Sequence, residues 1–177
     1  SINSGLSYNR KDINYIAVGS PSIASMDTQK FLYRDVPQIL APIHIIEDTD
    51  VKTIGDKHGI VLSLIDSFAI SFDSTETSCS ISIDGLSLDA EVVHVDAIQK
   101  IIQITSHALD NIQVGDTLTI EGIVVKGFEY RSGYSEGVIH LSVKGKSNFT
   151  EIDLVPKAIG KPNYGFDGNQ KALAGGV

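Results

Sequence analysis

Apolar and polar residues alternate along most of the middle of the chain, for example in Phe68–Phe72 and Val138–Val143. A period of two is typical of a β-strand that buries one face, whereas an amphipathic helix repeats at about 3.6 residues. Short alternating segments recur from Pro42 to Val155 with turn residues between them. The longest helical pattern, Ser106–Gln113, covers at most about two turns. The sequence therefore predicts an all-β fold of antiparallel strands.

We expect these strands to form an antiparallel β-sandwich, immunoglobulin-like or jelly-roll-like, with extended N- and C-terminal arms. Residues 1–30 are predicted to be an N-terminal arm, residues 31–155 the sandwich, and residues 156–177 an extended tail containing prolines and glycines. Alternation predicts a core that includes Ile60, Leu62, Leu64, Phe72, Ile81, Ile83, Val93, Val95, Ile102, Ile104, Leu118, Ile120, Val125, Ile139, Leu141 and Val143.

Two short motifs predict turns. Asp84-Gly85 suits the positive φ angles of a tight turn, and Asp116 is expected to hydrogen-bond to its own turn before a strand. Cys79 lies in an alternating segment, and we expect it to point into the core as a small apolar side chain. As the single cysteine, it cannot form an internal disulfide.

Charge and composition exclude several functions. Lysine and arginine total 14 against 22 acidic residues, for a net charge of −8, and no basic block is present. This argues against nucleic acid as a partner, because such binding requires a surface that follows phosphates. No apolar run is long enough to predict insertion into a membrane as a helix.

No motif for catalysis stands out, and the sequence predicts a protein that is not an enzyme. Gly133-Tyr134-Ser135-Glu136-Gly137 has the spacing Gly-x-Ser-x-Gly, but we interpret it as a turn, because the helix that follows a nucleophile elbow is not indicated. The phosphate-binding glycine loops are missing. A glycan hydrolase is the least favoured alternative, because no paired acids stand in a recognisable setting. The histidines are scattered, without metal-ligand spacing, at His44, His58, His94, His107 and His140.

Calcium is the one cofactor for which the sequence offers candidate ligands. Glu47, Asp48, Asp50 and Asp56 are close together in a loop, and their oxygen atoms are ligands of the kind that calcium prefers. Their spacing does not match an EF-hand loop. The alternative is a solvated acidic loop that keeps an edge strand soluble.

A candidate strand precedes the sandwich at Asp12–Gly19. Its apolar side chains lie on both faces, with Ile13 and Tyr15 on one side and Ile16 and Val18 on the other. No hairpin partner is evident nearby. We expect this strand to add to a sheet edge of another copy, with pairing inside its own subunit as the alternative.

From Val36 onward a set of short segments occurs in a characteristic order: Val36–Gln38, Ile43–Ile46, Gly59–Leu64, Phe72–Thr75, Val93–Val95, Ile101–Thr105, Val114–Gly122 and Phe128. In this order of features the chain resembles a β-sandwich domain that occurs, often in tandem, in large bacterial cell-surface and extracellular proteins. The resemblance covers about residues 36–145. It implies export and a structural or adhesive role at the surface.

Two functions remain favoured, both extracellular or at the cell surface. The first is a structural subunit of a polymer (fibre, sheath or surface layer) that joins copies of itself by strand exchange or tail docking. The second is an adhesive or ligand-binding module of a larger surface protein, with a glycan or another surface ligand as its partner. A module would be continued covalently at Ser1 and Val177, whereas a polymer subunit would have free ends there.

Overall fold

The computed structural model describes residues 19–32, 36–55, 59–65, 67–88, 92–128, 133–143 and 150–160. Within these ranges the chain forms short strands and one 3₁₀ helix, η1 (His107–Asn111). The strands are β1 (Ser22–Ser25), β2 (Gln29–Leu32), β3 (Gln38–Ile39), β4 (Ile43–Ile46), β5 (Ile60–Leu64), β6 (Ser71–Phe72), β7 (Ser80–Ile83), β8 (Leu86–Leu88), β9 (Val92–Val95), β10 (Ile101–Thr105), β11 (Thr117–Glu121), β12 (Val124–Lys126), β13 (Ile139–Val143), β14 (Glu151–Ile152) and β15 (Lys157–Gly160).

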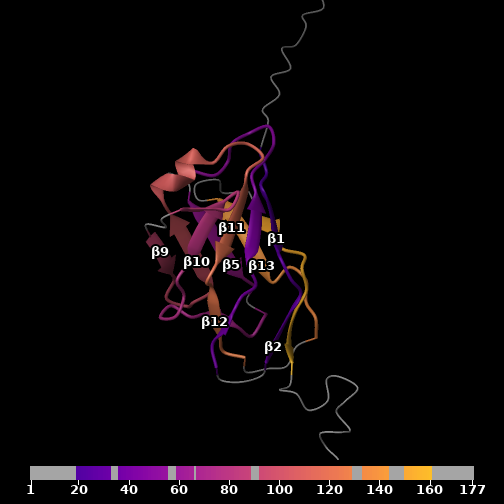
Figure 1. Cartoon of the computed structure of the whole chain (residues 1–177). Coiled ribbons are helices and arrows are strands. Elements are labelled where there is room, and N and C mark those ends of the chain that lie inside the picture. Colours follow the sequence, from indigo (N-terminus) through magenta and orange to yellow (C-terminus); the bar gives the residue numbers. More distant parts are fainter. Residues whose placement is uncertain are drawn as a thin grey trace, which may run out of the picture.

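Two antiparallel sheets form a sandwich, which confirms the predicted fold class (Figure 1). In the described part of the chain, one sheet has the order β1-β4-β11-β7-β8 and the other the order β14-β13-β5-β10-β9. Strand β1 contacts β14 at one side of the sandwich. On the opposite side lie the edge strands β8 and β9, which follow each other in the chain. A smaller sheet, β3-β12-β6, and a parallel pair, β15-β2, complete the described fold.

The core between the sheets consists mainly of the residues predicted from alternation. Of the predicted set, only Ile83, Val93 and Val95 are partly rather than fully buried, although they still pack against the core. All three lie near the side formed by β8 and β9, where fewer neighbours cover them. Alternation missed other core residues, such as Phe31 in the short strand β2, whose ring stacks on Phe128 with centroids 5.4 Å apart.

The turn motifs adopt the predicted conformations. Asp84 and Gly85 have φ angles of 48° and 83° and form the two-residue turn between β7 and β8. Gly122 has a φ of 82°, and a Cβ atom there would collide with the carbonyl oxygen of Ser78. The turn after β11 therefore requires glycine, both for its positive φ angle and because the backbone of Ser78 lies so close to it.

The described fold extends beyond the predicted sandwich boundaries at both ends. Residues 1–30 and 156–177 are predicted to be arms, yet β1 pairs antiparallel with β4, and β15 pairs parallel with β2. The four residues of β15 are all buried. A strand of this length carries too little local pattern to be recognised when its partner is far away in the sequence.

The two ends of the described chain lie at opposite poles of the sandwich. Figure 1 shows the indigo start of the chain at the top and its yellow end, next to β2, at the bottom. Gly19 is buried against Val51 and Thr53. In the described part of the chain, no helix is long and apolar enough to span a membrane.

Candidate assembly surface at the sheet edges

The side of the sandwich at β1 and β14 is closed by side chains. The Ser20 hydroxyl donates to a carboxylate oxygen of Glu151 at 2.9 Å, and the backbone N–H of Ser25 donates to Asp153 Oδ1 at 3.1 Å. Acidic side chains that follow β13 thus bond to β1 of the other sheet and to the residues just before it. This arrangement leaves little room for another strand between the two edges.

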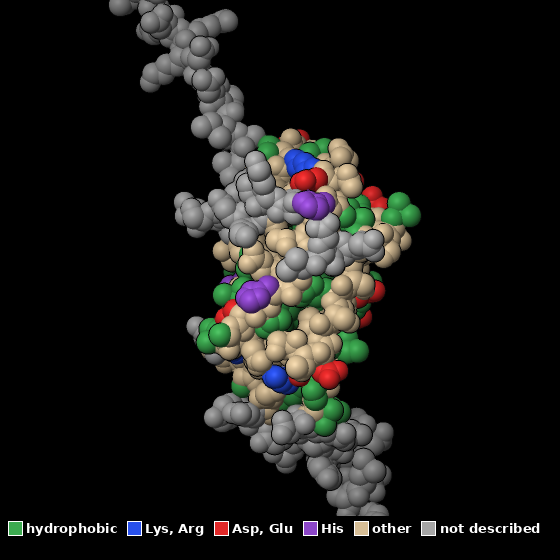
Figure 2. Space-filling view, turned by 90° about the vertical axis from the view of Figure 1, so that its left-hand side faces the viewer, with side chains coloured by type: hydrophobic (Ala, Val, Ile, Leu, Met, Phe, Trp, Pro, Cys, Tyr) green, Lys and Arg blue, Asp and Glu red, His purple; other side chains and the backbone are tan. Residues whose placement is uncertain are grey.

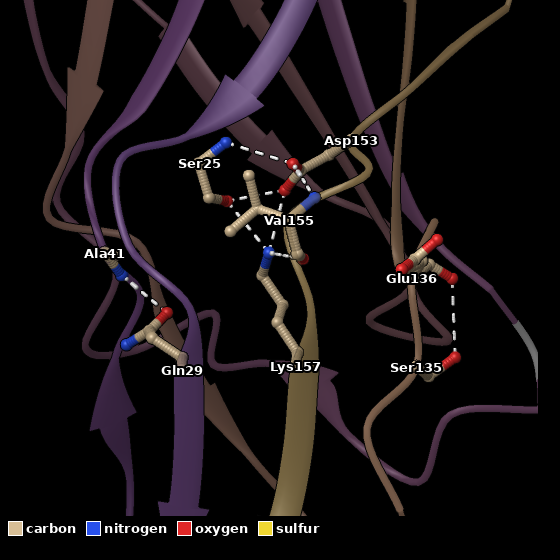
Figure 3. Close-up of polar contacts among 8 residues, drawn as sticks. All are labelled: Ser25, Gln29, Ala41, Ser135, Glu136, Asp153, Val155 and Lys157. Atoms are coloured by element: carbon tan, nitrogen blue, oxygen red, sulfur yellow. Dashed lines mark hydrogen bonds and ion pairs between the residues drawn. The ribbon is translucent and has the colours of Figure 1, made fainter.

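A buried polar cluster lies on this closed side, where β1 ends and β15 begins (Figure 3). Lys157 is fully buried, and its Nζ lies 2.7 Å from Asp153 Oδ2 and 2.9 Å from the Ser25 hydroxyl. The Ser25 hydroxyl donates to the same carboxylate oxygen at 2.5 Å. The other oxygen, Asp153 Oδ1, accepts the backbone N–H of Val155 at 3.0 Å. Each charge is thus paired and hydrogen-bonded, as burial of an ion pair requires.

The protonation of Asp153 reflects these contacts. Burial alone would raise the pKa of this carboxyl, because it disfavours the charged form. The hydrogen bonds from Lys157, Ser25 and the backbone outweigh burial, and the pKa is lowered from its ordinary value of 3.8. Asp153 is therefore an anion at neutral pH and balances the charge of Lys157.

The opposite side of the sandwich is open in the described part of the chain. Strands β8 and β9 each pair with one neighbour there, and their sequences, Leu86–Leu88 and Val92–Val95, contain no charged residue. Natural edge strands usually carry charges or prolines that block further pairing. Figure 2 shows the molecule from the side on which β9 lies; among the described residues, apolar, histidine and other uncharged atoms lie between charged side chains near the ends and margins of the face.

The register of β9 determines which backbone groups face outward. Asp96 N–H bonds to the carbonyl of Ile101, so His94 and Gln103 form the next hydrogen-bonded pair of this antiparallel ladder. The N–H and C=O groups of Val93 and Val95 consequently point away from β10. Their side chains are half-buried against the core. A strand added here would gain main-chain bonds and cover both valines.

One acidic residue of the loop, Glu47, is buried rather than solvated. Its carboxylate accepts the N–H groups of Thr53 and Ile54 at 2.9 and 2.7 Å and the Thr53 hydroxyl at 2.5 Å. Asp48 accepts the N–H groups of Asp50 and Val51 and, through its second oxygen, that of Ser20. These two acids therefore hold the loop and the start of the described chain together.

The calcium site stays a prediction. Asp56 lies outside the described residues, and within the described ranges no three His, Cys, Asp or Glu side chains are gathered as a metal site would require. Calcium would have to compete with the backbone donors that already occupy Glu47 and Asp48. The predicted assembly residues Ile13, Tyr15, Ile16 and Val18 also lie outside the described part of the chain.

Two further groups have perturbed pKa values for local reasons. The Thr75 hydroxyl and backbone N–H groups donate to Asp73, and with Lys126 at 3.6 Å they lower the pKa of this carboxyl. Burial raises the pKa of the Cys79 thiol to about 11, which makes it a poor nucleophile. Asp116 accepts the N–H of Gln113 at 2.7 Å, as its predicted role in the turn requires.

Sequence reasoning missed the cluster of Ser25, Asp153 and Lys157. A lysine among prolines and glycines is expected in solvent, and no local pattern reveals that β15 is buried. The one available signal was the apolar pair Ala158-Ile159 directly after Lys157.

No protein-family model and no curated protein matches the sequence. Among solved structures, the pilus backbone of Streptococcus pneumoniae is similar at 9% identity and a TM-score of 0.43 over 72% of this chain and 52% of that one. The N-terminal domain of a Streptococcus gordonii adhesin is similar at 10% identity and a TM-score of 0.45 over 79% of this chain and 32% of the other. The major pilin subunit of Bacillus cereus is similar at 12% identity and a TM-score of 0.43, over 80% and 39%.

These likenesses concern the fold alone. The β-sandwich is similar to domains of bacterial pilins and adhesins, the class of surface protein that the sequence resemblance predicts. The chain spans about half or less of each of these three structures.

Proposed function

We propose that this protein is a non-catalytic structural subunit of an extracellular or cell-surface polymer, in which β-sandwich subunits join by strand addition. The observation that carries the proposal is the open side of the sandwich. Strands β8 and β9 lack charged residues, and Val93 and Val95 present half-buried side chains and outward backbone groups. Such an edge is suited to accept a strand from another chain.

The segment Ile13–Val18 is the proposed donor. It leads directly into Gly19, which is buried near the β1 side of the sandwich. In a five-stranded sheet, β1 and β8 are separated by four strand spacings, or about 19 Å. An extended chain from Gly19 back to Ile13 spans at most about 20 Å. Crossing the sheet from β1 to β8 would therefore take its whole length and leave no residues to pair with β8. The segment is thus too short to pair with the open edge of its own subunit, which supports an acceptor edge on a second copy.

Strand donation of this kind is head-to-tail. A donor near one side of the sandwich and an acceptor edge on the other side give a heterologous contact, which builds a filament when the rotation does not close a ring. The C-terminal tail is a second candidate for docking on a neighbour, because β15, the last described strand, ends at the pole opposite Gly19 (Figure 1).

One observation favours the alternative, an adhesive or ligand-binding module of a larger surface protein. The two ends of the described chain lie at opposite poles, an arrangement that allows domains to be linked in series (Figure 1). In that case the open edge would accept a neighbouring module or an extended ligand rather than a free subunit.

The proposal is tested by removing the donor and the tail separately. The full chain, a variant lacking residues 1–18 and a variant lacking residues 161–177 are compared by size-exclusion chromatography and negative-stain microscopy. The first truncation stops before Gly19, because Gly19 and Ser20 are held by the fold. We expect filaments from the full chain and monomers when residues 1–18 are absent.

Each other outcome has a defined meaning. Filaments that persist without residues 1–18 but disappear without residues 161–177 would replace strand donation by tail docking. A full chain that stays monomeric at high concentration would contradict the polymer and favour the module.

A further inference from the structure

The cluster of Ser25, Asp153 and Lys157 has no part in the proposed assembly edge, yet it occupies a special place in the chain. Ser25 is the last residue of β1, and Lys157 is the first residue of β15. The cluster therefore joins the first described strand to the last one, across a sequence separation of 132 residues.

The strands around this cluster have a defined orientation relative to the ends of the chain. The start and the end of the described chain lie at opposite poles, and β2 and β15 run parallel in the register Gln29↔Lys157 to Leu32↔Gly160. A force that separates the two ends pulls β2 from its first residue and β15 from its last. In a parallel pair this geometry loads the evenly spaced hydrogen bonds together, whereas a peeling force would break them one at a time.

Strand β15 is also held on its other side. Ser135 and Lys157 exchange two backbone hydrogen bonds, of 2.8 and 3.0 Å. The side chains of Ala158 and Ile159 are buried, at 3% and 1% exposure. Sliding of β15 along its axis would thus break the ladder to β2 and the two bonds to Ser135, and expose apolar surface at the same time.

The buried cluster adds a direct connection between β1 and β15. Lys157 Nζ contacts the Ser25 hydroxyl, Asp153 Oδ2 and the carbonyl of Val155, at 2.9, 2.7 and 3.2 Å (Figure 3). Because Ser25 and Lys157 are buried, water cannot replace these bonds until the strands have separated. Charge-assisted bonds in such surroundings are among the stronger ones that a protein forms.

We propose that this fold bears mechanical tension between its two ends, and that β1, β2 and β15, locked by Ser25, Asp153 and Lys157, carry the load. The tension passes from the first strands to the last strand without crossing the open side at β8 and β9. The inference does not depend on polymerisation, because a module in a tandem chain is pulled in the same direction.

The test is single-molecule force spectroscopy on the full chain along two axes. One axis attaches the handles at the two chain ends. The other uses cysteines introduced at Ile98 and Val114, which are exposed and lie away from the cluster, in a Cys79→Ala background. Ser25→Ala removes one hydroxyl from the cluster and retains the ion pair. Thr75→Ala, which removes a hydroxyl bonded to Asp73 elsewhere, is the matched control.

For end-to-end pulling we expect Ser25→Ala to raise the unfolding rate under load about tenfold and Lys157→Met to raise it further. Thr75→Ala should leave that rate nearly unchanged, and pulling between positions 98 and 114 should respond weakly to Ser25→Ala. If Ser25→Ala has equal effects along both axes, the cluster is a general stabiliser and the proposal is wrong. It is also wrong if Ser25→Ala leaves end-to-end pulling unchanged. Should Lys157→Met fail to fold, Ser25→Ala alone decides.

Discussion

The edge strands on the two sides of the sandwich differ in whether side chains of other segments cover them. At β1 and β14, Glu151 bonds to Ser20, just before β1, and Asp153 bonds to Ser25 in β1, while Lys157 is buried nearby. At β8 and β9, the described edges carry leucine, valine, serine and histidine, and nothing charged. One side is sealed by polar side chains, and the other presents backbone groups and half-buried valines.

The difference shows that an edge is protected by what its neighbours donate as much as by its own sequence. Strand β1, Ser22–Ser25, is as free of charges as β9. It is closed because carboxylates from β14 and the segment after it reach across to it. The open side has no equivalent donor among the described residues, so its outward backbone groups are left to water or to an added strand.

The largest expected effect is on the closed side. Lys157→Met leaves Asp153 buried without its counter-charge, and we expect a loss of about 3–5 kcal/mol in the free energy of unfolding, measured by urea denaturation. Lys126→Met is the matched control, because Lys126 lies 3.6 Å from Asp73 and its side chain is 34% exposed. This control should cost less than about 1 kcal/mol. Equal losses in the two variants would show that burial does not distinguish the two pairs.

A smaller effect is expected from acid. The pKa of Asp153 is lowered in the folded protein, so the unfolded chain binds the proton more readily. The contribution of Asp153 to stability should be complete well above pH 3.8, the ordinary pKa, and disappear as the pH falls through the lower pKa of the folded state. Melting temperatures of the wild type and Asp153→Asn, followed from neutral pH into acid, should therefore converge. A constant difference between the two curves would contradict this assignment.

The smallest effect on folding, and the sharpest on assembly, is expected on the open side. His94→Lys places a charge on the edge strand, and Gln103→Lys places the same charge on the same face of the neighbouring strand. Both should change stability by less than about 0.5 kcal/mol. We expect only His94→Lys to prevent filament formation in negative-stain images. Equal assembly of both variants would show that β9 is not the acceptor edge.

Much of the fold could be predicted from the sequence because it depends on local patterns. Alternation placed Ile60, Leu62 and Ile102 in the core, and each is fully buried. Asp84-Gly85 identified a hairpin turn through the φ angles that it tolerates. Such features require only the side-chain period of a strand or the steric freedom of one residue.

The candidate site was predictable only in part. The shortage of charges in Leu86–Leu88 and Val92–Val95 can be read directly, but whether a strand lies at an edge depends on the order of the sheet. The burial of Glu47 could not be predicted either, because an acid in an acidic loop is expected to face solvent. It is buried because three donors of Thr53 and Ile54 surround its carboxylate.

The sequence by itself determined which residues form strands, which faces of those strands are apolar and where the chain turns, because neighbouring residues enforce these choices. Only the tertiary structure decided that β15 is a buried strand, that Lys157 pairs with Asp153, and that β8 and β9 lie at the edges of their sheets. These outcomes depend on contacts such as that between Lys157 and Ser25, which are 132 residues apart. A local pattern cannot specify such contacts, because they form only when both sheets have closed around the core.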